Sequence, residues 1–273
     1  MSSRTIHIDP RRGVIAMAGS DARAVLQGVV TNDMDRLAPG VPLYAALLTP
    51  QGKYLFDFFL IDTGEGRILI DVARDRGQDL ARALMGYCLR RDARIVGTGA
   101  MEVGLCLGDG PQPSTSENVA VVPDPRDHAL GWRLYGTDLA ETLGACPLDT
   151  DTTAQLNTLR VRLGVPETGV ELIPNDTFIL EAGFERLAGV DFRKGCYVGQ
   201  EVTARMKHKT ELRKGLVQVA VRGWADPGTA VTLGGKPAGT LFTVVDGAGL
   251  AHLRFDRAGL GMTAGDAVVD YPG

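Results

Sequence analysis

The chain has 273 residues, of which 44% are hydrophobic and 23% charged, and its net charge is −4 at pH 7. This composition is typical of a globular protein with a sizeable core, and the negative charge excludes a protein built to coat nucleic acid. No stretch reaches the apolar length of a membrane span, and the N-terminus lacks the apolar core of a signal peptide, so we expect a cytoplasmic protein without a membrane partner.

The first hundred residues alternate between strand-like and helix-like patterns. One helix is expected to run from an Asp21 cap to about Val30, and a second from about Asp75 to Arg91. The second helix has an apolar stripe at the spacing i, i+4, i+7 and i+8, formed by Leu80, Leu84, Tyr87 and Cys88. Strands are predicted at residues 6–8, 14–17, 43–48, 54–61, 67–72 and 101–107. Successive strands with a packed helix indicate an α+β fold with an antiparallel sheet.

The second half of the chain begins with a linker at residues 110–118. Two short strands and a helix that ends at Gly164 follow, and the chain is loop-like from Thr168 to Leu180. After Arg213, five strand patterns are separated by Gly and Pro turns, which predicts a small β-barrel or sandwich. These patterns lie at residues 216–221, 230–233, 240–245, 250–255 and 267–271.

The four cysteines are too widely spaced for a zinc or cluster motif, and they do not suggest a disulfide scaffold. Cys88, Cys106 and Cys146 have apolar neighbours and are interpreted as buried small side chains. Cys196 differs because a glycine precedes it and two cations, Arg193 and Lys194, lie close before it. Nearby cations favour the thiolate, which is the form that ligates metal or attacks electrophiles.

Residues 191–214 contain seven Lys or Arg residues and three acidic residues. A basic segment in an otherwise acidic chain indicates an anionic ligand or partner. The plainer interpretation is a solvated basic loop, which the unusual composition around Cys196 argues against.

Within this segment, residues 194–201 read KGCYVGQE and resemble the signature of YgfZ-like folate-binding proteins and their mitochondrial iron–sulfur cluster assembly relatives. Thr203, Ala204 and Arg205, and the pair Arg213 and Lys214, also look like that family. Further similar stretches lie at residues 19–33, at residues 48–53 followed by Asp57, and at residues 171–174.

This family shares its scaffold with the glycine-cleavage T-protein, an aminomethyltransferase that uses tetrahydrofolate. The resemblance implies a cloverleaf of subdomains with antiparallel sheets around a central folate pocket, in residues 1–210, plus a small C-terminal β-barrel in residues 211–273. Within the first region it implies one subdomain of about residues 1–42 with 112–210, and an inserted α+β subdomain at 43–111.

The resemblance implies that Cys196 is the reactive thiol and a metal ligand. It implies contacts to folate from Asn32, Asp33, Asp57, Lys194, Tyr197, Gln200, Glu201 and Arg205. On local evidence, residues 31–33 are a polar turn and Asp57 is equally compatible with the solvent face of an edge strand. The T-protein has two adjacent aspartates in this hairpin, whereas here Phe56 precedes Asp57.

Three functions remain open. The first is a factor that assists the assembly or repair of iron–sulfur clusters, with [4Fe–4S] maturation as its task, rather than a stand-alone enzyme. Its cofactors would be tetrahydrofolate or a derivative and a shared iron–sulfur cluster, and its partners A-type carrier proteins or client enzymes. The second is a folate-dependent aminomethyltransferase or other one-carbon transferase. The third is a scaffold with a vestigial folate pocket.

Overall fold

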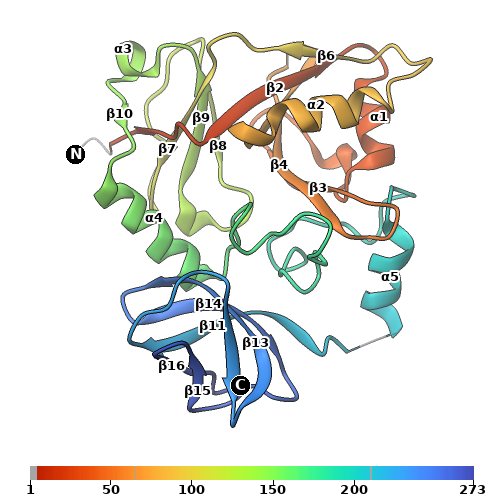
Figure 1. The fold of residues 1–273 in the computed structure, drawn as a ribbon. Helices are drawn as coiled ribbons and strands as arrows, with labels where there is room; N and C mark the ends of the chain where they lie inside the picture. Colours follow the sequence, from red (N-terminus) through yellow and green to blue (C-terminus); the bar gives the residue numbers. More distant parts are fainter. Residues whose placement is uncertain (1–4, 65, 210) are drawn as a thin grey trace. The chain divides into compact units, whose positions relative to one another are not determined.

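The computed structural model describes residues 5–64, 66–209 and 211–273. These residues form two compact units, and each unit is assembled from three separate stretches of the chain (Figure 1). Unit 1 comprises Met1–Leu48, Phe56–Thr152 and Arg186–Val198. Unit 2 comprises Thr49–Leu55, Thr153–Glu185 and Gly199–Gly273.

The first sheet of unit 1 has five strands in the order β3-β4-β5-β2-β6. Its central strand β5 pairs antiparallel with β2 and β4, with Ile70 opposite both Ile15 and Leu60. Strand β4 is almost wholly buried, which explains its nearly continuous apolar sequence. The strands are β2 Arg12–Ala18, β3 Leu43–Leu48, β4 Tyr54–Asp62, β5 Arg67–Ala73 and β6 Arg94–Gly97.

The second sheet of unit 1 has the order β10-β1-β7-β9-β8. Its pairs are antiparallel except for β1 with β10, where His7 lies opposite Cys146. Ile6, Cys106, Leu134 and Leu139 are among the buried residues that form its core. The strands are β1 His7–Ile8, β7 Glu102–Cys106, β8 Ala120–Pro123, β9 Trp132–Gly136 and β10 Cys146–Pro147.

A buried ion network lies in unit 1. The Asp71 carboxylate accepts hydrogen bonds from Arg12 Nε (2.7 Å), Arg133 Nε (3.1 Å) and the Tyr135 hydroxyl (2.9 Å). Burial by itself would raise the pKa of Asp71, but Arg12 and Arg133 outweigh burial and hold that pKa below its usual value. Asp71 is therefore a buried carboxylate whose charge is compensated by two guanidinium groups.

The helical segments of unit 1 are short. They are α1 Ala22–Val29, η1 Met34–Arg36, η2 Arg74–Arg76, α2 Gly77–Met85, η3 His128–Leu130 and α3 Leu139–Leu143. Asp21 precedes α1 as predicted, but its side chain does not cap the helix. Its carboxylate accepts instead from the Asp92 backbone N–H at 2.9 Å, which ties the start of α1 to the segment before β6.

The predicted second helix is shorter than expected and ends at Met85 rather than Arg91. Leu80 and Leu84 are buried as the stripe predicts, but Tyr87 is 42% exposed. The chain turns at Gly86, and Arg90 adopts a left-handed backbone with φ of 63°, which stops the helical periodicity. Strand β6 then follows in a stretch for which no strand was predicted.

Unit 2 contains two longer helices and the C-terminal barrel. The helices are α4 Thr150–Leu163, which begins at the last residues of unit 1, and α5 Gln200–Lys209. Helix α5 lies within the segment for which the sequence suggested no secondary structure. The six strands close in the order β11-β14-β13-β12-β15-β16 around a core that includes Val231, Leu241 and Leu253. They are β11 Lys214–Arg222, β12 Thr229–Leu233, β13 Lys236–Val245, β14 Ala248–Arg254, β15 Met262–Ala264 and β16 Ala267–Asp270.

The predicted fold class is confirmed in its antiparallel sheets and its C-terminal barrel, which is drawn in blue in Figure 1. The barrel includes the predicted strands and one strand, β15, that the sequence did not indicate. Three residues between two glycine turns are too few for a recognisable alternation.

Candidate functional site

The signature cysteine lies at the surface of unit 1. Cys196 is exposed, Cys106 is buried, and Cys88 and Cys146 are intermediate. The expectation of three buried cysteines is therefore wrong for two of them, because Cys146 lies on a two-residue edge strand and Cys88 follows the early end of α2. Desolvation raises the pKa of the Cys88 thiol.

Lys194, two residues before Cys196, points into the protein. Its side chain is buried, and its Nζ donates to the carbonyl oxygens of Gln27 (2.7 Å), Val30 (2.6 Å) and Asn32 (3.0 Å). Val30 is the C-cap of α1, so the ammonium group satisfies carbonyls that the end of the helix leaves without partners. An ammonium group has three donors, and all three are used here.

The electrostatics of Lys194 follow from this position. Desolvation lowers its pKa to about 8, although Asp33 and Asp191 act in the opposite direction. The sequence suggested that this cation favours the Cys196 thiolate or binds an anion. Its contacts show that it fixes the backbone carrying Cys196 to the end of α1, and its effect on the thiol stays a prediction.

The polar loop after α1 is built from its own side chains. Asn32 is buried, and its Nδ2 donates to the carbonyl oxygens of Tyr44 (2.8 Å) and Ala188 (2.7 Å). Asp33 caps η1 and accepts from the Asp35 N–H and from Gln27 Nε2. These two hydrogen bonds lower the pKa of Asp33, and the bond from the Asp35 N–H has the larger effect. Both predicted pocket residues thus have structural contacts.

Asp57 lies in the interior of the first sheet rather than on an edge strand. It is 4% exposed, and its Oδ2 accepts from the Tyr44 hydroxyl at 3.1 Å. Strand β4 has β3 on one side and β5 on the other, which removes the solvent-facing interpretation. A buried carboxylate needs such a partner because burying an uncompensated charge is costly.

The remaining predicted residues divide between the two units. Tyr197 is buried in unit 1, with its ring centroid 5.0 Å from Lys194 Nζ, a cation–π contact. Gln200, Glu201 and Arg205 lie on α5 of unit 2. Among the described residues Arg205 has no ion-pair partner, and its side chain is exposed. The sequence signature thus continues from unit 1 into unit 2 between Val198 and Gly199.

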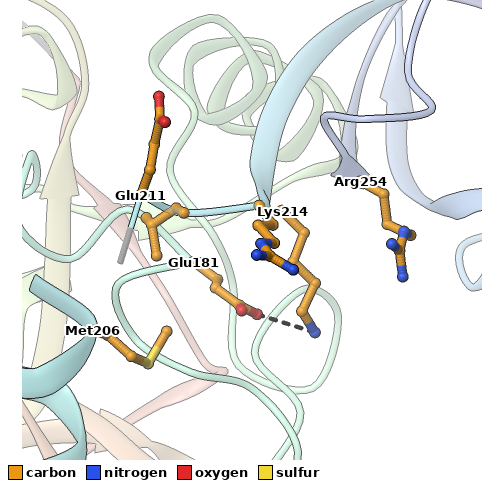
Figure 2. Close-up of a pocket in the computed structure, with 7 residues that line it drawn as sticks. Glu181, Met206, Glu211, Lys214 and Arg254 are labelled. Carbon is orange, nitrogen blue, oxygen red and sulfur yellow. Dashed lines mark ion pairs between the residues drawn. The ribbon is translucent and has the colours of Figure 1, made fainter. Parts of the chain in front are cut away.

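Part of the basic segment lines a pocket within unit 2. Figure 2 shows Lys214 and Glu181 forming an ion pair, with Met206 of α5 and Arg254 of β14 nearby. The Lys214 Nζ lies 3.3 Å from Glu181 Oε2, and the same carboxylate oxygen lies 3.2 Å from His252 Nε2. The pocket has a volume of about 320 Å³ and is lined by Glu181, Met206, Glu211, Leu212, Arg213, Lys214 and Arg254.

Tyr44, Glu181 and Arg254 are among the residues of these sites that were not predicted. Tyr44 could have been found, because it lies six residues before the predicted hairpin turn at 50–52 and Asp57 lies five residues after it. Glu181 and Arg254 had no such signal. One ends a loop-like stretch and the other ends a barrel strand, and only the tertiary fold brings them together.

Comparison with known proteins finds relatives among iron–sulfur cluster assembly factors. Residues 213–271 match the family model of the CAF17 C-terminal β-barrel domain. The chain is 32% identical over 224 residues to a Neurospora crassa protein named iron–sulfur cluster assembly factor IBA57 homolog, mitochondrial, and this match covers 74% of the chain. It is 29% identical over 271 residues to the mouse protein named iron–sulfur cluster assembly factor IBA57, mitochondrial, covering 89% of the chain.

Over most of its length the chain is thus similar to iron–sulfur cluster assembly factors of the IBA57 type. A further relative is a Phaeosphaeria nodorum protein named iron–sulfur cluster assembly factor IBA57 homolog, mitochondrial, which is 28% identical over 289 residues and covers 91% of the chain. The chain spans 50% of the length of the Neurospora IBA57 homologue, 70% of the Phaeosphaeria one and 75% of the mouse protein.

The fold of this chain is also that of the glycine-cleavage aminomethyltransferase. The crystal structure of aminomethyltransferase T from Bartonella henselae superposes with a TM-score of 0.78 over 99% of this chain and 86% of that protein. The sequence identity is 14%, so the likeness concerns the fold alone. The predicted T-protein-like fold is thereby confirmed.

The IBA57 relatives correct one prediction. The expected cytoplasmic location is wrong, because the Neurospora, Phaeosphaeria and mouse proteins are all named as mitochondrial. Among the residues that the structure describes, no helix is both long and apolar enough to cross a membrane.

Proposed function

We propose that this protein assists the assembly or repair of iron–sulfur clusters and that Cys196 provides a thiolate ligand to the cluster. The names of its relatives support the process. The observation that carries the role of Cys196 is its exposure within the signature, in contrast to the buried Cys106. A cysteine that ligates a cluster shared with a partner protein must have its sulfur accessible to that partner.

The cluster would be shared with a partner protein. Iron–sulfur clusters are usually held by four ligands, and Cys196 provides one. In the part of the chain that the structure describes, no three His, Cys, Asp or Glu side chains gather as a metal site. The missing ligands would therefore come from an A-type carrier or a client enzyme, and [4Fe–4S] maturation would be the step that this exchange serves.

Folate would be the second ligand, bound as a cofactor or regulator. Asp57, buried and bonded to Tyr44, fits the N–H donors of a reduced pteridine ring, because a carboxylate in apolar surroundings accepts such bonds strongly. The anionic glutamate tail would be attracted to the basic segment, which includes the exposed Arg193 of unit 1. Bound tetrahydrofolate would supply a one-carbon carrier or a reduced ring.

The role of Cys196 is tested by Cys196→Ser. Serine is a poor ligand for iron, and the exposed site loses little packing, so we expect loss of [4Fe–4S] enzyme activities in a strain that depends on the variant, with an unchanged melting temperature. Cys88→Ser is the matched control, since Cys88 is partly exposed but lies outside the signature. Full rescue by Cys196→Ser at normal protein levels would remove the ligand role.

Folate binding is tested by calorimetry with mono- and polyglutamylated tetrahydrofolate. We expect Asp57→Asn to weaken the binding of both folates, and Arg193→Gln to weaken mainly the binding of the polyglutamylated one, with the larger effect at low salt. Cys196 alkylation should be unchanged in both variants. Absence of binding to the wild-type protein would reject folate as a ligand.

The second candidate function is folate-dependent one-carbon transfer. The likeness to the aminomethyltransferase fold and the buried Asp57 favour it. Phe56 at the position of the first aspartate counts against it. Aminomethyl transfer by the purified protein would promote this function above cluster assembly.

A further inference from the structure

Three exposed apolar side chains lie together after the end of α2. Among the described residues of unit 1, four large hydrophobic side chains are classed as exposed, and three of them fall within five positions. They are Met85 (49% exposed), Tyr87 (42%) and Leu89 (77%). Single exposed apolar side chains are ordinary, whereas a group of them indicates an interaction surface.

Hydrogen bonds hold this turn in shape. The N–H of Tyr87 donates to the Leu84 carbonyl (3.0 Å) and that of Cys88 to the Met85 carbonyl (3.1 Å). The Cys88 thiol also donates to the Leu84 carbonyl at 3.4 Å, and the Arg91 N–H donates to the Cys88 carbonyl. The chain that follows α2 toward β6 (Figure 1) is thus a set of consecutive turns, and every residue from Met85 to Asp92 except Cys88 is exposed.

Arginines flank the apolar group in the sequence. Residues 82–94 contain four arginines and one aspartate. Arg82 pairs with Asp79 at 3.3 Å, whereas Arg90 and Arg91 are exposed and have no ion-pair partner among the described residues. The single aspartate, Asp92, accepts from the Ser20 N–H and hydroxyl, so it is already engaged.

We propose that this surface binds an acidic amphipathic segment of a partner protein. We call it the α2 patch, and it consists of Met85, Tyr87, Leu89, Arg90 and Arg91. The arginines complement carboxylates of the partner, and they add most where binding removes water from both charges. Met85 and Leu89 gain only by covering apolar surface, which a phosphate backbone does not offer, so a protein segment fits better than a nucleic acid.

The test uses the full chain and a synthetic helical peptide with glutamates on one face and leucines on the other. Two reference peptides separate the contributions: one has glutamine in place of every glutamate, and one has the same composition in scrambled order. Binding is followed by fluorescence anisotropy, and amide hydrogen exchange locates the protected residues. We expect binding of the acidic amphipathic peptide alone, with protection at residues 82–94.

Variants decide whether the α2 patch is responsible. Leu89→Ser should lower the affinity for the acidic amphipathic peptide by about tenfold or more, and so should the double substitution Arg90→Glu with Arg91→Glu. Val41→Ser and Arg162→Glu are matched controls, because Val41 is 52% exposed and Arg162 is exposed without an ion-pair partner among the described residues. These control proteins should bind the peptide with the affinity of the wild-type protein. The rate of Cys196 alkylation should be equal in all variants.

Several outcomes would overturn the proposal. The first is equal binding of the glutamine peptide, and the second is equal binding by the Leu89→Ser protein. The third is protection of the α2 patch by phosphatidylserine vesicles or by an oligouridine strand in place of the peptide.

Discussion

A single buried ammonium group organises the region around the signature cysteine. Lys194 joins three carbonyl oxygens at the end of α1, and its neighbour Tyr197 packs against it. Cys196, between them in sequence, is exposed. The pair of inward-facing side chains therefore holds the loop while the cysteine remains accessible.

Lys194→Met should destabilise the protein by about 3 kcal/mol or more, because hydrogen bonds from charged donors contribute about 1.5–3 kcal/mol each and three buried carbonyls lose theirs. Amide exchange should increase at residues 27–32 and urea unfolding should shift to lower concentration. Lys207→Met is the control, since Lys207 is exposed at its ion pair with Glu185. Unchanged exchange at residues 27–32 would show that the ammonium contacts contribute little.

The sequence predicted the special character of Cys196 but not the role of Lys194. Its neighbours in sequence suggested an activated thiol, because charge and glycine content are local properties. The partners of Lys194 are more than 160 residues away along the chain. No local pattern could report them. The same limit applies to Asn32, which looked like a turn residue and bonds across to Ala188.

At the scale of elements, the hairpin turn at Gly52 packs against the start of α5 in unit 2. Gly52 has φ of 75°, and a Cβ added there would lie 2.8 Å from Val202 Cβ and 3.2 Å from the Gly199 carbonyl oxygen. Gly199 itself has φ of 81° and precedes α5 directly. The turn therefore needs glycine for its backbone conformation and for its close approach to the helix.

Gly52→Ala should destabilise unit 2 by more than the backbone strain alone, which is about 1–2 kcal/mol for a left-handed alanine. Gly40→Ala separates the two contributions, because Gly40 has φ of 78° and open space around its Cβ position. We expect both variants to have a lower melting temperature than wild type, and the temperature of Gly52→Ala should be the lower of the two. Amide hydrogen exchange in α5 should be faster in Gly52→Ala. Equal melting temperatures of the two variants would mean that Val202 can move away from the added methyl group without loss of stability.

Elements with strong local periodicity were predicted well, and the short ones were not. The apolar strand at residues 54–61 and the barrel strands were evident from sequence because burial dictates their pattern. Helix α2 was extended too far because Tyr87 and Cys88 continue its apolar spacing, whereas Gly86 ends it. Helix α5 was missed because its polar, basic sequence has no apolar stripe, and of its described side chains only Thr203 is fully buried.

At the scale of the whole molecule, unit 1 depends on a buried charge. Asp71 lies between Arg12 of β2 and Arg133 of β9, and it thereby links the two sheets of this unit. A buried ion pair adds little compared with an apolar core, but removing one partner leaves the others uncompensated. The network is thus a place where one substitution has a large effect.

Asp71→Asn should lower the free energy of unfolding by about 3–5 kcal/mol, because two buried guanidinium groups lose their counter-charge. Since the pKa of Asp71 is lowered in the fold, its stabilisation is present above about pH 4 and is lost as the pH falls through the lowered value. Urea unfolding across this range should show a shallower acid dependence in the variant. Asp256→Asn, at an exposed pair, should leave the unfolding midpoint unchanged.

The contact between Lys194 and the end of α1 also sets an order for events during synthesis. Residues 27–32 leave the ribosome long before residue 194 is translated, and at about 5–20 residues per second the delay lasts roughly ten seconds or more. During that time the carbonyls at the end of α1 lack their ammonium partner, and the last stretch of unit 1, Arg186–Val198, does not yet exist. A nascent chain without this segment leaves the loop at residues 27–32 without its partners Ala188, Gly189 and Lys194. We expect this protein to engage chaperones during translation and to be released from them once the cysteine loop has emerged.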